Sequence, residues 1–341
     1  MSRILVTGGA GYIGSHTAKA LVMAGHDPVV YDNLSTGHAW AVKWGPLVVG
    51  DLCDADLLRK TIDEHQIDSV IHFAASAYVG ESVREPRQYY RNNICNTMNL
   101  LEVMLEAGVS NVVFSSSCAT YGEPRSIPIP EHHTQDPLSP YGESKHFVER
   151  MLRSYGNAYG LQWVSLRYFN AAGADASGEI GEVHDPETHL IPLAFHAATG
   201  QIPSLEILGT DYSTPDGTAI RDYIHVSDLA DAHVSAAEYL SDRNPSVAIN
   251  LGNGTGYSVR EVVDTVQSIT ALRVPVVAAP RRPGDAPALV ADADRARTLL
   301  GWQPRYPDLG SIISTAWNWY SASGPEHLQP IGARPLALQH T

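Results

Sequence analysis

The first half of the chain alternates short apolar runs with longer stretches of helical periodicity. Apolar runs predict strands at residues 4–6, 29–31, 47–49, 70–73, 112–114 and 163–166. Helical periodicity predicts helices at residues 13–24, 55–65, 89–107 and 144–159. Strands that alternate with helices indicate βαβ units with right-handed crossovers. We therefore predict an α/β fold, a doubly wound, Rossmann-like parallel sheet with helices on both faces.

The pattern changes after about residue 169. Segments 171–185 and 210–218 are rich in Gly, Pro, Ser and acidic residues and predict loops. Helical patterns return at residues 228–240, 259–269 and 309–320. We expect a sheet domain over residues 1–169 and a smaller mixed α/β domain over 170–323, with some of that chain returning to the sheet. Residues 324–341, which contain several prolines, are expected to form a loose tail.

Composition excludes several classes of function. The formal net charge is −14, so the surface as a whole repels nucleic acid and anionic membranes. We see no apolar run of about 18 residues and no signal peptide. The three cysteines lack metal spacing and suggest reduced thiols in a cytoplasmic protein. The fifteen histidines form no His-Glu-x-x-His motif and no compact ligand cluster, so we expect no metal site.

A glycine-rich turn follows the first predicted strand. Gly8, Gly11 and Gly14 recur at three-residue spacing, and Gly9, Gly11 and Gly14 also satisfy Gly-x-Gly-x-x-Gly. Such a turn brings backbone N–H groups and a helix N-terminus toward a pyrophosphate. Asp32 ends the second predicted strand and would accept hydrogen bonds from an adenosine ribose, which favours NAD over NADP. Asp51-Leu52 and Phe73-Ala74-Ala75 follow later strands, where the same dinucleotide would pass.

A second constellation points to proton transfer. Tyr141 and Lys145 are four positions apart, so both lie on one face if a helix begins there. A nearby ammonium and a cationic nicotinamide ring would favour the phenolate of Tyr141, which could then act as a base. The strand at 112–114 leads into a run of serines. If Tyr141 takes the proton of a substrate hydroxyl, Ser117 could hydrogen-bond that hydroxyl and relay the proton.

Together these segments identify a likeness that covers residues 4 to about 320. The chain resembles the extended short-chain dehydrogenase/reductase family and, within it, the UDP-glucose 4-epimerases. The segments that carry the resemblance are Val6 to His16, Tyr31 to Leu34, Val79 to Ser82, Ser115 to Gly122, Ser139 to Gly142, Leu166 to Asn170 and Arg221 to Val226.

The resemblance implies an NAD-dependent isomerase that interconverts UDP-glucose and UDP-galactose through transient oxidation at C4 and return of hydride to the opposite face. It implies Tyr141 as base, Lys145 as its electrostatic partner and Ser117 as proton relay. It also implies a homodimer packed through the helices at 89–107 and 144–159. The expected cofactor residues are Gly8, Gly11, Tyr12, Ile13, Gly14, Asp32, Asn33, Asp51, Leu52, Phe73, Ala74, Ala75, Asn92, Ser115, Tyr141, Lys145 and Tyr168. The expected substrate residues are Ser117, Tyr141, Asn170, His189, Leu190, Arg221, Arg282 and Asp285.

Three positions depart from the family pattern. Ala77 replaces a lysine that often contacts the cofactor, so NAD retention could be weaker. His189 stands where some relatives have asparagine. Leu289 is intermediate in size at a wall position that is bulky in members restricted to glucose and galactose and small in members that accept N-acetylhexosamines.

Other functions stay open at this point. A UDP-pentose, UDP-uronate or UDP-N-acetylhexosamine 4-epimerase would carry the same catalytic residues. A 4,6-dehydratase is disfavoured, because Cys118 and Ala119 occupy the positions where an acid–base pair would be needed. From another class, a non-catalytic NAD-sensing protein would share the fold.

Overall fold

A computed structural model describes residues 1–282 and 285–322. Its centre is a seven-stranded sheet in the order β10-β6-β5-β4-β1-β2-β3, with every neighbouring pair parallel. The strand order reverses between β1 and β4, which is the topological switch point of a doubly wound sheet. The predicted fold class is confirmed. The strands are β1 (Arg3–Thr7), β2 (Asp27–Asp32), β3 (Leu47–Val49), β4 (Ser69–His72), β5 (Asn111–Ser117), β6 (Gln162–Tyr168) and β10 (Val247–Leu251).

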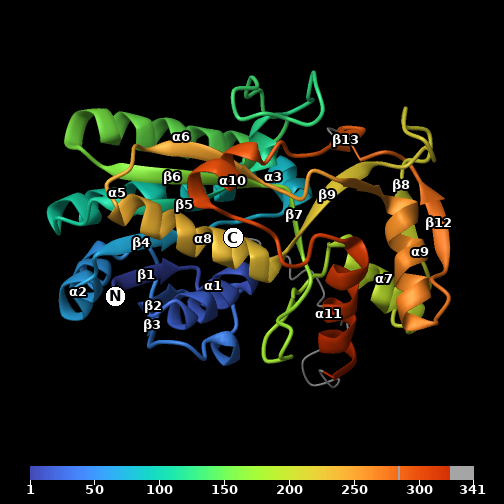
Figure 1. Ribbon diagram of the computed structural model, residues 1–341, viewed down its shortest axis with the longest axis horizontal. Helices are drawn as coiled ribbons and strands as arrows, with labels where there is room; N and C mark the ends of the chain where they lie inside the picture. Colours follow the sequence, from blue (N-terminus) through green and yellow to red (C-terminus); the bar gives the residue numbers. More distant parts are fainter. Residues whose placement is uncertain (283–284, 323–341) are drawn as a thin grey trace, which may run out of the picture.

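Helices cover both faces of this sheet, as Figure 1 shows. Alternate side chains of a strand point to opposite faces, so Leu5 joins one core while Ile4 and Val6 join the other. The first core packs against α2 (Ala55–His65), α5 (Asn96–Glu106) and α6 (Pro140–Tyr159). The second packs against α1 (Tyr12–Met23), α8 (Val226–Ser241) and α10 (Asp294–Leu300). Because both faces are buried, the strands are nearly continuous apolar runs.

A second group of elements lies beyond the carboxyl ends of β5 and β6, at the right of Figure 1. Strand β9 (Ile220–His225) pairs with β7 (Asn170–Ala172), β11 (Gly256–Ser258) and β13 (Ala288–Leu289). Strands β8 (Leu205–Leu208) and β12 (Val276–Ala279) form a separate pair. Helices α7 (Leu190–Ala198), α9 (Val259–Thr270) and α11 (Leu309–Ala322) share one apolar core. The expected loose tail at 324–341 lies outside the described residues.

Two helices differ from their predicted bounds near the site. Helix α6 begins at Pro140 rather than at 144, because Ser139 caps it through a hydrogen bond from the Gly142 N–H. The helix predicted at 89–107 is three segments: α4 (Pro86–Tyr89), a π-helical turn (Tyr90–Cys95) and α5. A short helix, α3 (Val79–Arg84), precedes them. Two single-turn 3₁₀ helices, Ala39–Ala41 and Cys118–Thr120, complete the fold.

The loop predicted at 171–185 contains most of strand β7 at its start. Strand β10 comes from the second half of the chain and returns to the large sheet beside β6, as expected. Among the described residues, no helix is long and apolar enough to cross a membrane.

Candidate active site

The glycine turn between β1 and α1 forms a cradle without side chains. A Cβ on Gly14 would lie 2.3 Å from the Gly8 carbonyl oxygen. Gly8 has a φ of +72°, and a Cβ there would lie 2.6 Å from the Ala74 nitrogen. Both positions therefore require glycine. The first turn of α1 has no side-chain cap, so the N–H groups of Tyr12 and Ile13 face an anion site, while the Gly11 N–H donates to the Gly8 carbonyl at 3.2 Å.

Two acidic residues stand at neighbouring strand ends beside this cradle. The buried carboxylate of Asp32 accepts hydrogen bonds from the N–H groups of Ala10 (2.9 Å) and Leu34 (2.8 Å). Burial raises the pKa of Asp32, although these two hydrogen bonds oppose the rise. Asp51 accepts a 2.7 Å hydrogen bond from the Asn33 amide. The predicted pair Asn33 and Asp51 thus share one corner, next to buried Leu52.

The segment after β4 closes the other side of the cradle. Both Phe73 and Ala74 donate backbone hydrogen bonds to the Thr7 carbonyl, at 2.9 and 3.1 Å. This holds Ala74 against Gly8, so a dinucleotide over the turn would run past Ala74 and Ala75. A bare cradle at a helix N-terminus, with a carboxylate at the end of β2, fits the pyrophosphate and ribose of NAD.

Ser117, Tyr141 and Lys145, the residues expected to handle the proton, lie together beyond the cradle. Ser117 ends β5, and Tyr141 and Lys145 lie on the first turns of α6, which crosses that strand end. The Lys145 ammonium donates a 2.8 Å hydrogen bond to the Ser115 carbonyl and lies 5.9 Å from the centre of the Tyr141 ring. All three side chains are at most 9% exposed, so the reactive groups are shielded from bulk water.

Burial acts against the charged form of both reactive groups on α6. It lowers the pKa of the Lys145 ammonium to about 7. It raises the pKa of the Tyr141 phenol, Tyr168 adds to that rise, and a hydrogen bond with Ser117 opposes it. Without a bound cofactor, burial therefore keeps Tyr141 in its neutral phenol form. Additional positive charge next to Tyr141 is needed for the phenolate to be populated.

Polar side chains on β5, β6 and the π-helical turn surround the pair. The Ser115 hydroxyl and the Tyr168 hydroxyl are 2.6 Å apart, at the ends of β5 and β6. The π-helical turn carries Asn92, whose amide donates a 3.0 Å hydrogen bond to the Ser76 hydroxyl. Predicted cofactor residues Asn92, Ser115 and Tyr168 therefore border the site from different sides. π-helical turns of this kind occur frequently at functional sites.

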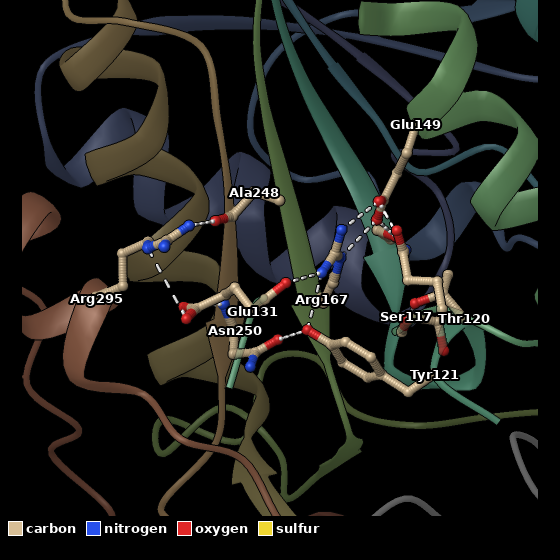
Figure 2. Close-up of polar contacts among 11 residues, drawn as sticks. Ser117, Thr120, Tyr121, Glu131, Glu149, Arg167, Ala248, Asn250 and Arg295 are labelled. Carbon is tan, nitrogen blue, oxygen red and sulfur yellow. Dashed lines mark hydrogen bonds and ion pairs between the residues drawn. The ribbon is translucent and has the colours of Figure 1, made fainter. Parts of the chain in front are cut away.

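Behind Ser117 lies a buried ion pair that the sequence analysis missed. Glu149 and Arg167 form two hydrogen bonds of 2.6 and 2.9 Å (Figure 2). The Ser116 hydroxyl donates a third to Glu149 at 2.6 Å. Burial would raise the pKa of Glu149, but Arg167 outweighs it and lowers that pKa. Arg167 also donates to the Tyr121 hydroxyl. The spacing of Tyr141, Lys145 and Glu149 along one helix face could have indicated this residue.

The predicted arginines of the substrate site come together around one carboxylate. Arg221 on β9 and Arg282 both form ion pairs with Asp285, the second at 3.2 Å. Arg221 is 9% exposed, whereas the Arg282 side chain is 48% exposed. Leu289 lies opposite Arg221 in the β13–β9 pairing and packs against a cluster that contains Cys118, the neighbour of Ser117. Asn170 begins β7, opposite Tyr223 on β9.

His189 and Leu190 take different places from these arginines. Leu190 begins α7 and packs against the core of the second group of elements. The His189 imidazole faces Glu182 and Glu187, which also face His184. Burial opposes protonation of both histidines, but the carboxylates outweigh it and raise the pKa of His184 to about 9 and that of His189 to about 10.

The absence of a compact cluster among the histidines was a wrong expectation. Glu182, His184, Glu187 and His189 bring four possible ligand atoms within 4.8 Å of one another. The alternation of acidic residues and histidines over residues 182–189 is visible in the sequence. Its spacing matches no helical motif, because an irregular loop brings the four side chains together.

Comparison with known proteins gives one consistent result. Residues 4–252 match the model of the NAD dependent epimerase/dehydratase family. A protein of Rhizobium meliloti curated as UDP-glucose 4-epimerase is 52% identical over 320 residues, which are 94% of this chain and 97% of that protein. A crystal structure of UDP-glucose 4-epimerase from Brucella ovis in complex with NAD is similar, with a TM-score of 0.91, 54% identity and coverage of 94% and 98% of the two chains. The corresponding enzyme from Bifidobacterium longum, in complex with NAD⁺ and UDP, has a TM-score of 0.90 and 38% identity, with 94% and 99% covered.

Proposed function

Because the chain belongs to the NAD dependent epimerase/dehydratase family, we propose that it interconverts UDP-glucose and UDP-galactose by transient oxidation and reduction at C4. It is an NAD-dependent isomerase. The observation that carries the proposal is the convergence of Ser117, Tyr141 and Lys145 at one shielded point. That point lies between a dinucleotide cradle and a pair of arginines, which is the order of groups that a UDP-sugar beside NAD requires.

The chain's own residues handle the proton. When bound, NAD supplies the hydride acceptor and donor and a cationic ring. Tyr141 takes the proton of the C4 hydroxyl, and Ser117, already hydrogen-bonded to Tyr141, orients that hydroxyl. Lys145 adds positive charge to the same space, and its hydrogen bond to the Ser115 carbonyl fixes where that charge lies.

The nucleotide half of the substrate is assigned to the second group of elements. Arg221 and Arg282 supply the local positive charge that a chain of net charge −14 otherwise lacks, and guanidinium groups suit a pyrophosphate. Asp285 aligns both arginines and is placed to accept from the nucleotide ribose. Leu289, near Cys118, is proposed as the wall beside the sugar.

The decisive experiment mixes purified protein with UDP-galactose, without added NAD, and follows the sugar protons by NMR. Appearance of UDP-glucose is expected and would show that NAD is retained through purification. Conversion only after NAD is added would point to weaker retention, consistent with Ala77. No conversion even with NAD would contradict the proposal, and parallel samples of UDP-pentose, UDP-uronate and UDP-N-acetylhexosamine would then identify a different sugar. Absence of conversion with every sugar, despite bound NAD, would favour a non-catalytic NAD sensor.

We further propose a homodimer packed through α5 and α6. These elements and the π-helical turn between α4 and α5 expose large apolar side chains: Tyr90 (37%), Met98 (40%), Phe147 (47%) and Tyr159 (65%). A contact that covers such side chains removes apolar surface from water. We place the reaction in the cytoplasm, since Cys53, Cys95 and Cys118 are all unpaired.

A further inference from the structure

The loop between β7 and α7 holds a second cluster of reactive side chains, separate from Ser117 and Tyr141. The His189 Nδ1 lies 2.7 Å from Glu182 and 3.3 Å from Glu187. The His184 Nδ1 lies 3.2 Å from Glu182 and 3.8 Å from Glu187. Four side chains from eight consecutive residues thus direct one nitrogen or oxygen each at a common point.

Two buried atoms of this cluster lie 3.2 Å apart as an ion pair but make no well-directed hydrogen bond. They are Oε1 of Glu182 and Nδ1 of His184. The Glu182 side chain is only 9% exposed and that of Glu187 only 5%. Burying a polar atom without a partner is costly, and two carboxylates this close repel each other unless positive charge lies between them. Protons on the two histidines can supply that charge, but they leave these two atoms without a directed hydrogen bond, whereas a cation bound by all four groups would engage both atoms.

We propose that Glu182, His184, Glu187 and His189 bind one divalent zinc ion. Two imidazole nitrogens and two carboxylate oxygens are a donor set that zinc accepts, and bonds of 2.0–2.2 Å place tetrahedral ligand atoms roughly 3.3 to 3.6 Å apart. The four histidine–carboxylate separations of 2.7 to 3.8 Å bracket that range, and all four ligand atoms lie within 4.8 Å of one another. The charge of the ion balances the negative charge of the two carboxylates. When no ion is bound, protons on the two histidines balance that charge instead.

The ion would hold the loop against the cofactor cradle rather than take part in the reaction. Four protein ligands leave no open position, which is the pattern of structural zinc sites. His184 makes edge-on ring contacts with Tyr12 and Tyr78, at centroid distances of 6.3 and 6.1 Å. Tyr12, the first residue of α1, donates a 2.6 Å hydrogen bond to the Gly173 carbonyl at the start of the same loop. A small cavity of about 40 Å³ lies between the glycine turn and His184.

Metal binding tests the inference directly and does not depend on the reaction. Full-length protein is stripped with a chelator, dialysed and titrated with Zn²⁺ by calorimetry, and Co²⁺ is used as a coloured probe of ligand geometry. We expect one ion per chain and the visible absorption of tetrahedral Co²⁺. Absence of binding at neutral pH would overturn the proposal and leave the cluster as protonated histidines paired with carboxylates.

The position of the ion is tested by measuring Zn²⁺ affinity in variants of the proposed ligands. His189→Asn is the first choice, because this side chain is 46% exposed and its loss should not unfold the chain. We expect Zn²⁺ affinity to fall by more than about 100-fold in His189→Asn and in Glu182→Gln, since loss of even an outer-shell partner costs about 10- to 100-fold. The matched control is His132→Asn, an exposed histidine of another loop. Equal affinity in all three variants would place the ion elsewhere and refute the assignment. The thermal midpoint of the wild-type chain should rise with Zn²⁺, and that of His189→Asn should not.

Discussion

Lys145 is a buried charged residue that lowers the stability of the folded chain. It is 4% exposed, and burial lowers its pKa from 10.5 to about 7. A group with a folded pKa below its unfolded pKa binds fewer protons in the folded chain. It therefore destabilises the fold fully below about pH 7, and this effect shrinks as the pH rises toward 10.5.

The first prediction follows from this dependence of stability on pH. Lys145→Met should raise the free energy of unfolding of the cofactor-free chain, most strongly below pH 7, with the gain declining toward pH 10. Urea unfolding at several pH values measures it, and a gain that grows with pH would contradict the reasoning. The same variant should lose most turnover, because Tyr141 then lacks its cationic neighbour.

Tyr141 carries the second prediction. Tyr141→Phe removes only the hydroxyl oxygen, while the ring keeps its edge-on contact with Tyr89 at 6.5 Å. We expect an unchanged circular dichroism spectrum and a fall in kcat of about 10²- to 10⁴-fold, the usual contribution of a positioned acid or base. NMR assays with UDP-galactose measure it. Activity within a few-fold of wild type would remove Tyr141 from the role of base.

Single residues were the most predictable part of the site. Tyr141 and Lys145 could be placed together from their spacing alone, because a helix makes positions four apart neighbours. The resemblance assigned Arg221 and Asp285 to one substrate site, but their direct pairing across 64 positions was not predicted, since no local rule brings such residues together. The sequence indicates the ammonium beside Tyr141 but not the burial that raises the pKa of its phenol.

At the scale of elements, the Glu149–Arg167 pair joins α6 to β6 behind Ser117, the proposed proton relay. Ser116 and Arg167 are direct partners in the β5–β6 pairing, and both bind Glu149. This network of three side chains fixes the position of α6 relative to both strands. Because Tyr141 and Lys145 lie on that same helix, the network positions the reactive groups without touching the substrate.

The third prediction is that Arg167→Met destabilises the chain by about 3–5 kcal/mol, because it leaves a buried carboxylate without its partner. The lowered pKa of Glu149 contributes stability above its ordinary value of 4.5, which is lost as the pH falls through the folded value. The deficit of the variant should therefore shrink under acid conditions. Urea unfolding at pH 7 and pH 4 checks both statements.

The double variant Glu149→Leu/Arg167→Met is the control for that measurement. It removes both charges and should recover much of the lost stability, since apolar replacement of a buried ion pair is often neutral. A double variant no more stable than Arg167→Met alone would mean that packing, rather than the unpaired carboxylate, causes the loss.

Element boundaries were harder to predict than element types. The main strands and helices of the large sheet were found because their apolar runs are long and periodic. The π-helical turn at Tyr90–Cys95 was read as ordinary helix, since its apolar spacing is not distinct from that of α5. Strands of the second group, such as β9, were missed as strands because Ile220–His225 mixes charged and apolar side chains that are all largely buried. Pairing with distant segments stabilises that strand, and such pairing leaves no local pattern.

At the scale of the whole molecule, the large sheet carries the glycine cradle and the second group carries the two arginines, so the proposed reaction centre lies where the two groups of elements meet. The structure describes a single chain, and the proposed dimer rests on the apolar side chains that α5, α6 and the adjoining π-helical turn expose. Phe147 and Tyr159 lie on α6, the helix that also carries Tyr141. Dimer formation would therefore stabilise α6 by packing against the face that is exposed in the single chain.

The fourth prediction tests that interface. Phe147→Glu places a charge on a side chain that is 47% exposed in the single chain, where the fold itself should tolerate it. If α6 packs against a second copy, the buried charge has no partner, and the variant should sediment as a monomer while the wild type sediments at twice the chain mass. Val277→Glu, on β12 and 46% exposed, is the matched control and should remain dimeric. A wild-type chain that is monomeric at every concentration would refute the dimer, and a Phe147→Glu dimer as stable as the wild type would move the interface away from α6.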